Sequence, residues 1–124
     1  VVLSAAGLPA GVHGVHIHQT GLCDAPDFTT AGGHFNPTSR QHGTQNPNGP
    51  HAGDLPNLTV DANGQGMMNG TAMGVTMVGG GANSVRKPGG TALVVHATAD
   101  DYRTDPSGNS GARIACGVIP AAED

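Results

Sequence analysis

The most informative stretch of this sequence reads Gly11-Val12-His13-Gly14-Val15-His16-Ile17-His18. Along a β-strand, side chains two residues apart lie on the same face. His16 and His18 can therefore bind one metal ion together, because neutral imidazole is the commonest protein ligand for zinc and copper. His13 has the opposite parity, and we expect it to be structural. The stretch predicts a strand that carries a metal-binding pair on one face.

Three further apolar runs join Val12–Ile17 as predicted strands: Leu55–Val60, Thr91–His96 and Ile114–Ile119. Each run is short, rich in β-branched residues and bounded by Gly, Pro, Asn or Asp, which favours strands separated by turns. No window shows a 3.6-residue helical period. The 124 residues suffice for one domain, and its core must be mainly aliphatic because aromatic residues make up 2% of the chain. The sequence predicts an all-β domain with long loops.

Two long loops lie between these predicted strands. The first runs from His18 to Leu55 and has little regular pattern, and loops of this length are uncommon unless they are functional or disordered. The second, Ala99–Ala112, is polar and precedes the last strand. By contrast, we expect the segment Gly79–Gly90 to be a connection without chemistry.

The first loop carries a second set of possible metal ligands: His34, His42, His51 and Asp54. Three ring nitrogens and one carboxylate oxygen would make a closed tetrahedral site suited to zinc. His96 ends a strand and can join His16 and His18. The alternative is a surface set of polar side chains that binds no metal, but the spacing of so many histidines favours the metal site.

Charge and hydropathy exclude some functions. The net charge of −4 and the absence of a Lys/Arg cluster argue against a nucleic-acid partner. No apolar stretch approaches the length of a transmembrane helix, and no signal peptide is visible at the start of the chain.

The two cysteines, Cys23 and Cys116, are far apart and lie outside any CxxC motif. They could be zinc ligands, a free pair or a disulfide. Because so many histidines are available for metal, we favour the disulfide. A disulfide implies an oxidising location, periplasmic or extracellular.

Several motifs follow one another along the chain: Gly11–His18, Gly33-His34-Phe35-Asn36-Pro37, His42-Gly43, Pro50-His51-Ala52-Gly53-Asp54-Leu55, Leu93-Val94-Val95-His96 with Ala99-Asp100-Asp101, and Gly108–Ile119. Together they resemble the Cu/Zn superoxide dismutases, and look most like the bacterial secreted branch of that family. The resemblance extends from about residue 1 to residue 120, and only Gly64–Gly90 matches poorly.

The resemblance implies one domain over residues 1–124, an immunoglobulin-like Greek-key β-sandwich or barrel with a metal-binding loop and an active-site loop. It implies four copper ligands: His16, His18, His34 and His96. It implies four zinc ligands: His34, His42, His51 and Asp54. The ring of His34 would therefore bridge the two ions.

The resemblance also assigns roles outside the ligand sets. Asp100 would accept hydrogen bonds from the outer nitrogens of His16 and His42. Arg113 would lie beside the open copper position and attract the superoxide anion. Cys23 and Cys116 would form an intrasubunit disulfide that anchors the first loop to the last strand.

The activity implied is the disproportionation of superoxide to O₂ and H₂O₂ by alternate reduction and oxidation of copper. When copper is reduced, its bond to His34 should break and that ring should take up a proton. Zinc would hold His34 and order the loop without redox chemistry. The resemblance leaves the oligomeric state open, with a homodimer as one option.

Three departures from the family pattern carry expectations. The chain starts at Val1, which matches the middle of the family's third strand, so we expect an N-terminally truncated domain with an exposed sheet edge. Val15 replaces the usual aromatic residue and should thin the core. The loop Ala97–Ala112 is short and its basic residues are limited to Arg103 and, just beyond it, Arg113, so long-range attraction of anions should be weaker.

Two other functions compete with the enzyme. One is a non-catalytic copper- or zinc-binding protein with a dismutase-like fold. The presence of all four copper ligands argues against it. The other is an interaction fragment whose missing strands another chain supplies.

Overall fold

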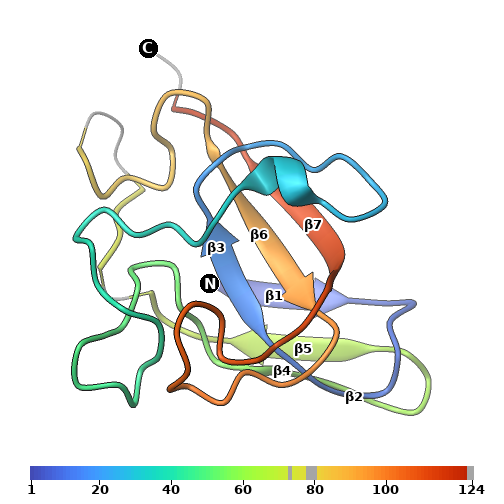
Figure 1. Ribbon diagram of the computed structural model, residues 1–124. Helices are drawn as coiled ribbons and strands as arrows, with labels where there is room; N and C mark the ends of the chain where they lie inside the picture. The colour runs from blue at the N-terminus through green and yellow to red at the C-terminus, as the bar shows by residue number, and fades with distance from the viewer. Residues whose placement is uncertain (73, 78–80, 123–124) are drawn as a thin grey trace.

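Two antiparallel sheets make up the computed structural model, which describes residues 1–72, 74–77 and 81–122 (Figure 1). The larger sheet has the strand order β1-β5-β4-β2. Its strands are β1 (Val2–Ala5), β2 (Gly11–His13), β4 (Leu58–Val60) and β5 (Gly66–Asn69). The smaller sheet has the order β3-β6-β7. Its strands are β3 (Val15–His18), β6 (Thr91–His96) and β7 (Arg113–Ile119).

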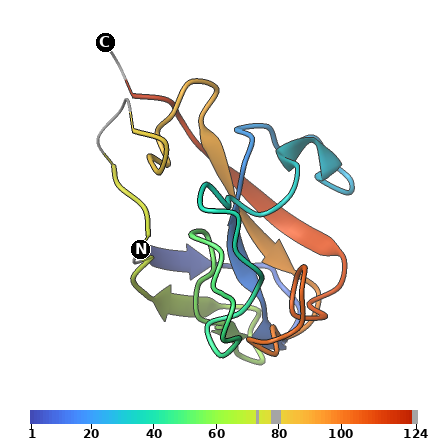
Figure 2. The same ribbon diagram turned by 60° about the vertical axis from the view of Figure 1, so that its left-hand side comes forward.

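This architecture confirms the all-β sandwich predicted from the sequence. The helical structure in the described residues is a single 3-10 turn, η1 (Thr29–Ala31). Figure 2 shows the strands of one sheet running across those of the other. No helix among the described residues is long and apolar enough to cross a membrane.

Gly14 divides the first predicted strand between the two sheets. β2 pairs with β4 in one sheet, and β3 pairs with β6 in the other. The Gly14 N–H donates to the Thr98 carbonyl at 2.8 Å, and the Gly14 carbonyl accepts from the His96 N–H at 2.8 Å. A Cβ on Gly14 would lie 2.8 Å from the Cβ of Ser110. Only glycine therefore fits at this crossing without displacing its neighbours.

Strand β3 is buried on both faces, and its two faces have different roles. Val15 and Ile17 join the hydrophobic core with Leu58 and Val60 of β4. Burial of each such side chain contributes about 1.5–3 kcal/mol. Val15 is fully buried, so the valine at this position still contributes to the core.

Besides the division at Gly14, the observed strands differ from the predicted ones in one boundary and in two additional strands. β4 begins at Leu58 rather than Leu55, because Asp54 and its neighbours form part of the loop. β1 and β5 were not among the predicted apolar runs; they pair with each other over four residues, from Val2 with Asn69 to Ala5 with Gly66. Their mixture of polar, glycine and apolar residues gives a weak strand signal.

The loop from residue 19 to residue 57 is ordered by main-chain bonds to β3. Isolated β-bridges pair His18 with His34 and His16 with Asp54. The Phe35 N–H donates to the Ile17 carbonyl at 2.8 Å. The loop thus returns to the same strand twice, at His34 and at Asp54, which are two of the predicted metal ligands.

The predicted disulfide is present. Cys23 and Cys116 are bonded with their Cα atoms 5.6 Å apart, which anchors the start of the loop to β7. β1 and β2 end the larger sheet and β3 and β7 end the smaller one, as far as the described residues show. The predicted connection Gly79–Gly90 forms turns over its described part, residues 81–90; Gly79 and Gly80 lie outside the described residues.

Candidate metal centre

One cluster of imidazoles gathers on the outer face of β3. Their ligand atoms lie within 4.8 Å of one another, and the residues are His16, His18, His34 and His96. His16 and His18 come from β3, whereas His96 ends the neighbouring strand β6. All three strand histidines are at most 3% exposed. The pleat of β3 and its pairing with β6 therefore bring together three of the four residues expected to bind copper, and the loop residue His34 joins them through its bridge to His18.

Hydrogen bonds fix which nitrogens of this cluster carry protons. Nδ1 of His18 lies 2.8 Å from the Gly32 carbonyl, and Nδ1 of His96 lies 3.1 Å from the Gly111 carbonyl. Because a carbonyl oxygen only accepts, both Nδ1 atoms donate and both Nε2 atoms present lone pairs. These two Nε2 atoms lie 3.3 Å apart. The lone pairs on these two atoms repel each other, and a cation bound to both atoms would remove that repulsion.

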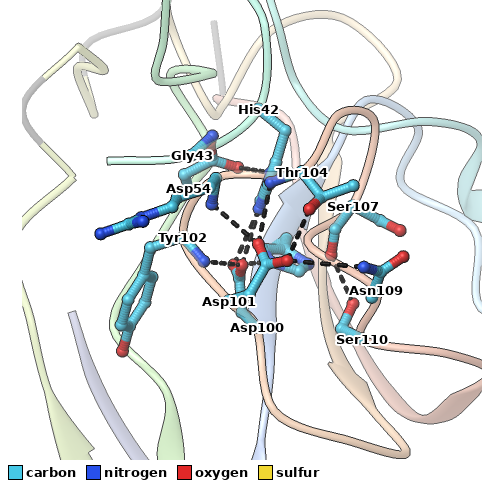
Figure 3. A network of polar contacts seen from close by, with 12 residues as sticks. His42, Gly43, Asp54, Asp100, Asp101, Tyr102, Thr104, Ser107, Asn109 and Ser110 are labelled. Atoms are coloured by element: carbon cyan, nitrogen blue, oxygen red, sulfur yellow. Dashed lines mark hydrogen bonds and ion pairs between the residues drawn. The ribbon is translucent and has the colours of Figure 1, made fainter. Parts of the chain in front are cut away.

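Asp100 joins this cluster to the loop histidines. Nε2 of His16 donates to Oδ2 of Asp100 at 2.7 Å, and Nε2 of His42 donates to Oδ1 at 2.8 Å. The Tyr102 N–H donates to Oδ1 at 2.7 Å, as Figure 3 shows. Burial alone would raise the pKa of Asp100, but these hydrogen bonds hold it below its usual range. Asp100 therefore stays ionised and orients both rings.

The second cluster shares two histidines with the first. Its ligand atoms also lie within 4.8 Å of one another, and its members are His16, His34, His42 and Asp54. His51 lies at the rim of this cluster, with Nδ1 3.0 Å from Nδ1 of His34 and 3.6 Å from Oδ1 of Asp54. The four residues whose ligand atoms lie this close together therefore include His16, whereas the sequence predicted His51 as the fourth zinc ligand.

His34 faces both clusters with its two nitrogens. Its Nδ1 lies 3.4 Å from Oδ1 of Asp54, on the side of the loop residues. Its Nε2 is buried and has no hydrogen-bond partner among the described residues. A single ring placed in this way can supply one ligand atom to each of two ions.

The orphaned polar atoms test whether metal ions fit these clusters. Within the described part of the chain, the buried side-chain atoms that meet no hydrogen-bond criterion are His16 Nδ1, His34 Nε2, His42 Nδ1 and Asp54 Oδ1. The last two lie 2.9 Å from each other as an ion pair, so His16 Nδ1 and His34 Nε2 are the fully unpartnered atoms of this set. All four belong to the residues predicted to bind metal. Leaving a buried polar atom unsatisfied costs about 1–3 kcal/mol. Cations at these positions would satisfy every one of them, so the donor set fits copper and zinc.

The charge states of the two clusters differ. Burial, the largest influence, lowers the pKa of His16 and of His96 to about 4, so both rings are neutral at pH 7. Burial would also lower the pKa of His42, but the carboxylates of Asp100 and Asp54 raise it to about 9. His42 is therefore protonated at pH 7 until a metal ion displaces its proton.

A pocket of about 400 Å³ opens onto the first cluster. Its lining includes His18, His34 and His96 together with Ser107 and Arg113. Nη1 of Arg113 donates to the Phe28 carbonyl at 2.8 Å, which fixes the guanidinium at the pocket. An anion that enters therefore meets a permanent positive charge beside the imidazoles.

Other predicted residues lie elsewhere. His13 is outside both clusters; its Nδ1 lies 2.8 Å from the His96 carbonyl and its Nε2 2.7 Å from the Pro9 carbonyl, which fits the expected structural role. Arg103 is exposed, and its Nε donates to Oε1 of Gln45. Sequence reasoning missed the carbonyls of Gly32 and Gly111, because main-chain acceptors leave no signal in residue types.

The fold and the donor set define a β-sandwich protein with two adjoining clusters of side chains that could hold metal ions. The family model "Copper/zinc superoxide dismutase" matches residues 1–119. Cu-Zn superoxide dismutase 1 of Aquifex aeolicus is 50% identical over 120 residues, which cover 96% of this chain and 71% of that protein. The superoxide dismutase-like protein YojM of Bacillus subtilis is 47% identical over 118 residues, which cover 94% of this chain and 60% of that protein.

The structural comparison agrees. The crystal structure of a superoxide dismutase-like protein from Bacillus subtilis has a TM-score of 0.88 and 46% identity, over 95% of this chain and 79% of that one. The chain belongs to the Cu/Zn superoxide dismutase family.

Proposed function

We propose that this protein, acting as one domain over residues 1–124, disproportionates superoxide to O₂ and H₂O₂. Copper would be held by His16, His18, His34 and His96. Zinc would be held by His34, His42, His51 and Asp54. The observation that carries the proposal is the position of His34, whose nitrogens face the two clusters separately while Nε2 is buried and unpartnered among the described residues.

Copper would supply one-electron reduction and oxidation, and zinc would hold His34 and order the loop. The protein's own residues do the rest. Arg113 attracts the superoxide anion into the pocket. Asp100 holds His16 by accepting its Nε2–H, which leaves Nδ1 free as a ligand atom. His34 lines the pocket, so its Nε2 can hold one of the two protons that the peroxide product needs, and the second comes from solvent.

We also propose an oxidising location, periplasmic or extracellular. The support is the disulfide between Cys23 and Cys116, because structural disulfides persist where the surroundings are oxidising.

The test is the rate of superoxide consumption by the purified protein, with copper and zinc contents measured on the same samples. We expect the rate to rise in proportion to copper content while zinc content is held constant. Copper- and zinc-loaded protein that leaves superoxide at its uncatalysed decay rate would instead identify a non-catalytic metal-binding protein.

A further inference from the structure

We propose that Asn57 is a positioning residue of the metal centre: its side chain holds the main chain of Asp100 so that the Asp100 carboxylate can bridge His16 and His42. This inference rests on the proposed metal sites. It assigns a role to a residue that is neither a ligand nor a neighbour of the pocket.

The contact between Asn57 and Asp100 is reciprocal. Nδ2 of Asn57 donates to the Asp100 carbonyl at 2.9 Å, and the Asp100 N–H donates to Oδ1 of Asn57 at 2.9 Å. One side chain thus satisfies both main-chain polar groups of Asp100. An asparagine amide suits this task because it offers one donor and one acceptor side by side.

A further hydrogen bond ties the same two segments together. The Asn57 N–H donates to the Tyr102 hydroxyl oxygen at 2.9 Å. The Tyr102 N–H in turn donates to Oδ1 of Asp100 at 2.7 Å. Asn57, Asp100 and Tyr102 therefore form one connected unit, which we call the Asn57 clamp.

Asn57 is a rigid base for this clamp. It lies directly before β4, between Leu55 and Leu58, which are 1% and 0% exposed. Asp100, by contrast, lies in the loop after β6. The clamp therefore holds the loop residue Asp100 in place through a segment that is itself anchored in the core.

The Asp100 carboxylate is packed closely against Gly108 and His42, so it has little room to move. Gly108 has φ +68°, and a Cβ there would overlap the Asp100 carboxyl group and approach Nε2 of His42 within 2.8 Å. Movement of the Asp100 main chain would therefore misplace the acceptor on which His42 depends. His16 should be affected less, because β3 holds it in register opposite Val94 of β6.

The experiment is a double-mutant cycle read as zinc affinity, measured by titrating the copper- and zinc-loaded protein with a chelator. The variants are Asn57→Ala, Asp100→Ala and the double substitution. Because losing an outer partner of a metal ligand costs about 10–100-fold in affinity, we expect Asn57→Ala to weaken zinc binding about tenfold in the otherwise unchanged protein. In the Asp100→Ala background it should have no further effect, because the carboxylate it positions is gone.

Asn46→Ala is the matched control. Nδ2 of Asn46 joins the same two loops by donating to the carbonyls of His42 and Arg103, at 3.1 and 3.2 Å. It does not act through the Asp100 side chain, so its effect on zinc affinity should be equal in both backgrounds. Asn57→Asp is measured in the same cycle; it keeps the side-chain volume and the acceptor for the Asp100 N–H but loses the donor to the Asp100 carbonyl, so its effect should also be smaller in the Asp100→Ala background.

An effect of Asn57→Ala and of Asn57→Asp that is undiminished in the Asp100→Ala background would overturn the proposal. That result is distinct from failure of the proposed function, in which the unchanged protein itself would not bind zinc or would not consume superoxide.

Discussion

His16 and His18 lie on a strand, paired residue by residue with β6, whereas His42 and His51 lie in a loop that a disulfide and a few main-chain bonds hold in place. The strand histidines His16 and His96 are neutral at pH 7, because burial lowers their pKa to about 4. His42 is protonated, because two carboxylates raise its pKa to about 9. The strand half of the proposed centre is thus already in the charge state that binds metal, whereas the loop half would have to lose a proton for zinc to bind.

His34→Ala removes the ring that both halves share, and it has the largest expected effect. Loss of an outer hydrogen-bond partner of a metal ligand costs about 10–100-fold in activity. Here both ions lose the ligand itself, so activity should fall further than that. The measurement is superoxide consumption together with the visible spectrum of copper. Unchanged activity with an unchanged spectrum would contradict the shared role. His13→Gln is the matched control: it alters a buried histidine outside both clusters and should lower thermal stability while both metals stay bound.

The pH dependence of metal binding sharpens the contrast in charge. Zinc must displace the proton of His42, so zinc affinity should rise about tenfold per pH unit from pH 6 to pH 8 and level off near the pKa of about 9. The strand histidines are already neutral in this range, so copper affinity should change little. Calorimetric titrations in buffers of different ionisation enthalpy would count the protons released. Equal proton release for the two metals would contradict the assigned charge states.

Asp100→Asn tests how far each half depends on its outer partner. His42 relies on Asp100 for orientation, whereas His16 is also held by β3. We therefore expect zinc affinity to fall by about 10–100-fold and copper affinity to fall less. Metal contents after dialysis against a chelator give both values. Equal losses of the two metals would show that the strand offers His16 no protection.

Arg113→Ile leaves the ligands of both halves in place and removes the charge at the pocket. The rate constant for superoxide should fall about tenfold at low ionic strength, because electrostatic steering accelerates association by 10-fold or more. The rate should also depend less on salt than in the unchanged protein. Rates measured from low to high salt, with metal contents alongside, decide this. A variant that keeps the original rate and salt slope would show that Arg113 does not guide the anion.

The sequence predicted the strand half of the centre better than the loop half. The i, i+2 spacing of His16 and His18 and the position of His96 at a strand end are local signals, and β pairing then leaves few alternatives for where these rings point. The loop residues could be recognised as a set, but their arrangement depends on long-range bonds. The pairing of His34 with His18 and of Asp54 with His16 has no signature in composition or spacing.

The contrast between local sequence signals and long-range contacts also explains the remaining differences between the predicted and the observed strands. The strands β6 and β7 were predicted almost to the residue, because their apolar runs are continuous and bounded by turn residues. β1 and β5 were missed because their residues mix polar, glycine and apolar types. The Asn57 clamp could not be predicted either, since Asn57 and Asp100 are 43 residues apart and meet only in the folded chain.

The central claim is that one ring, His34, belongs to both metal sites, and the electron paramagnetic resonance spectrum of copper tests it most directly. Spectra are recorded for copper-loaded protein with zinc present and after zinc is removed. We expect removal of zinc to change the copper spectrum, because Nδ1 of His34 is released and the ring bound through Nε2 changes in basicity and orientation. Identical copper spectra with and without zinc would contradict the shared ring.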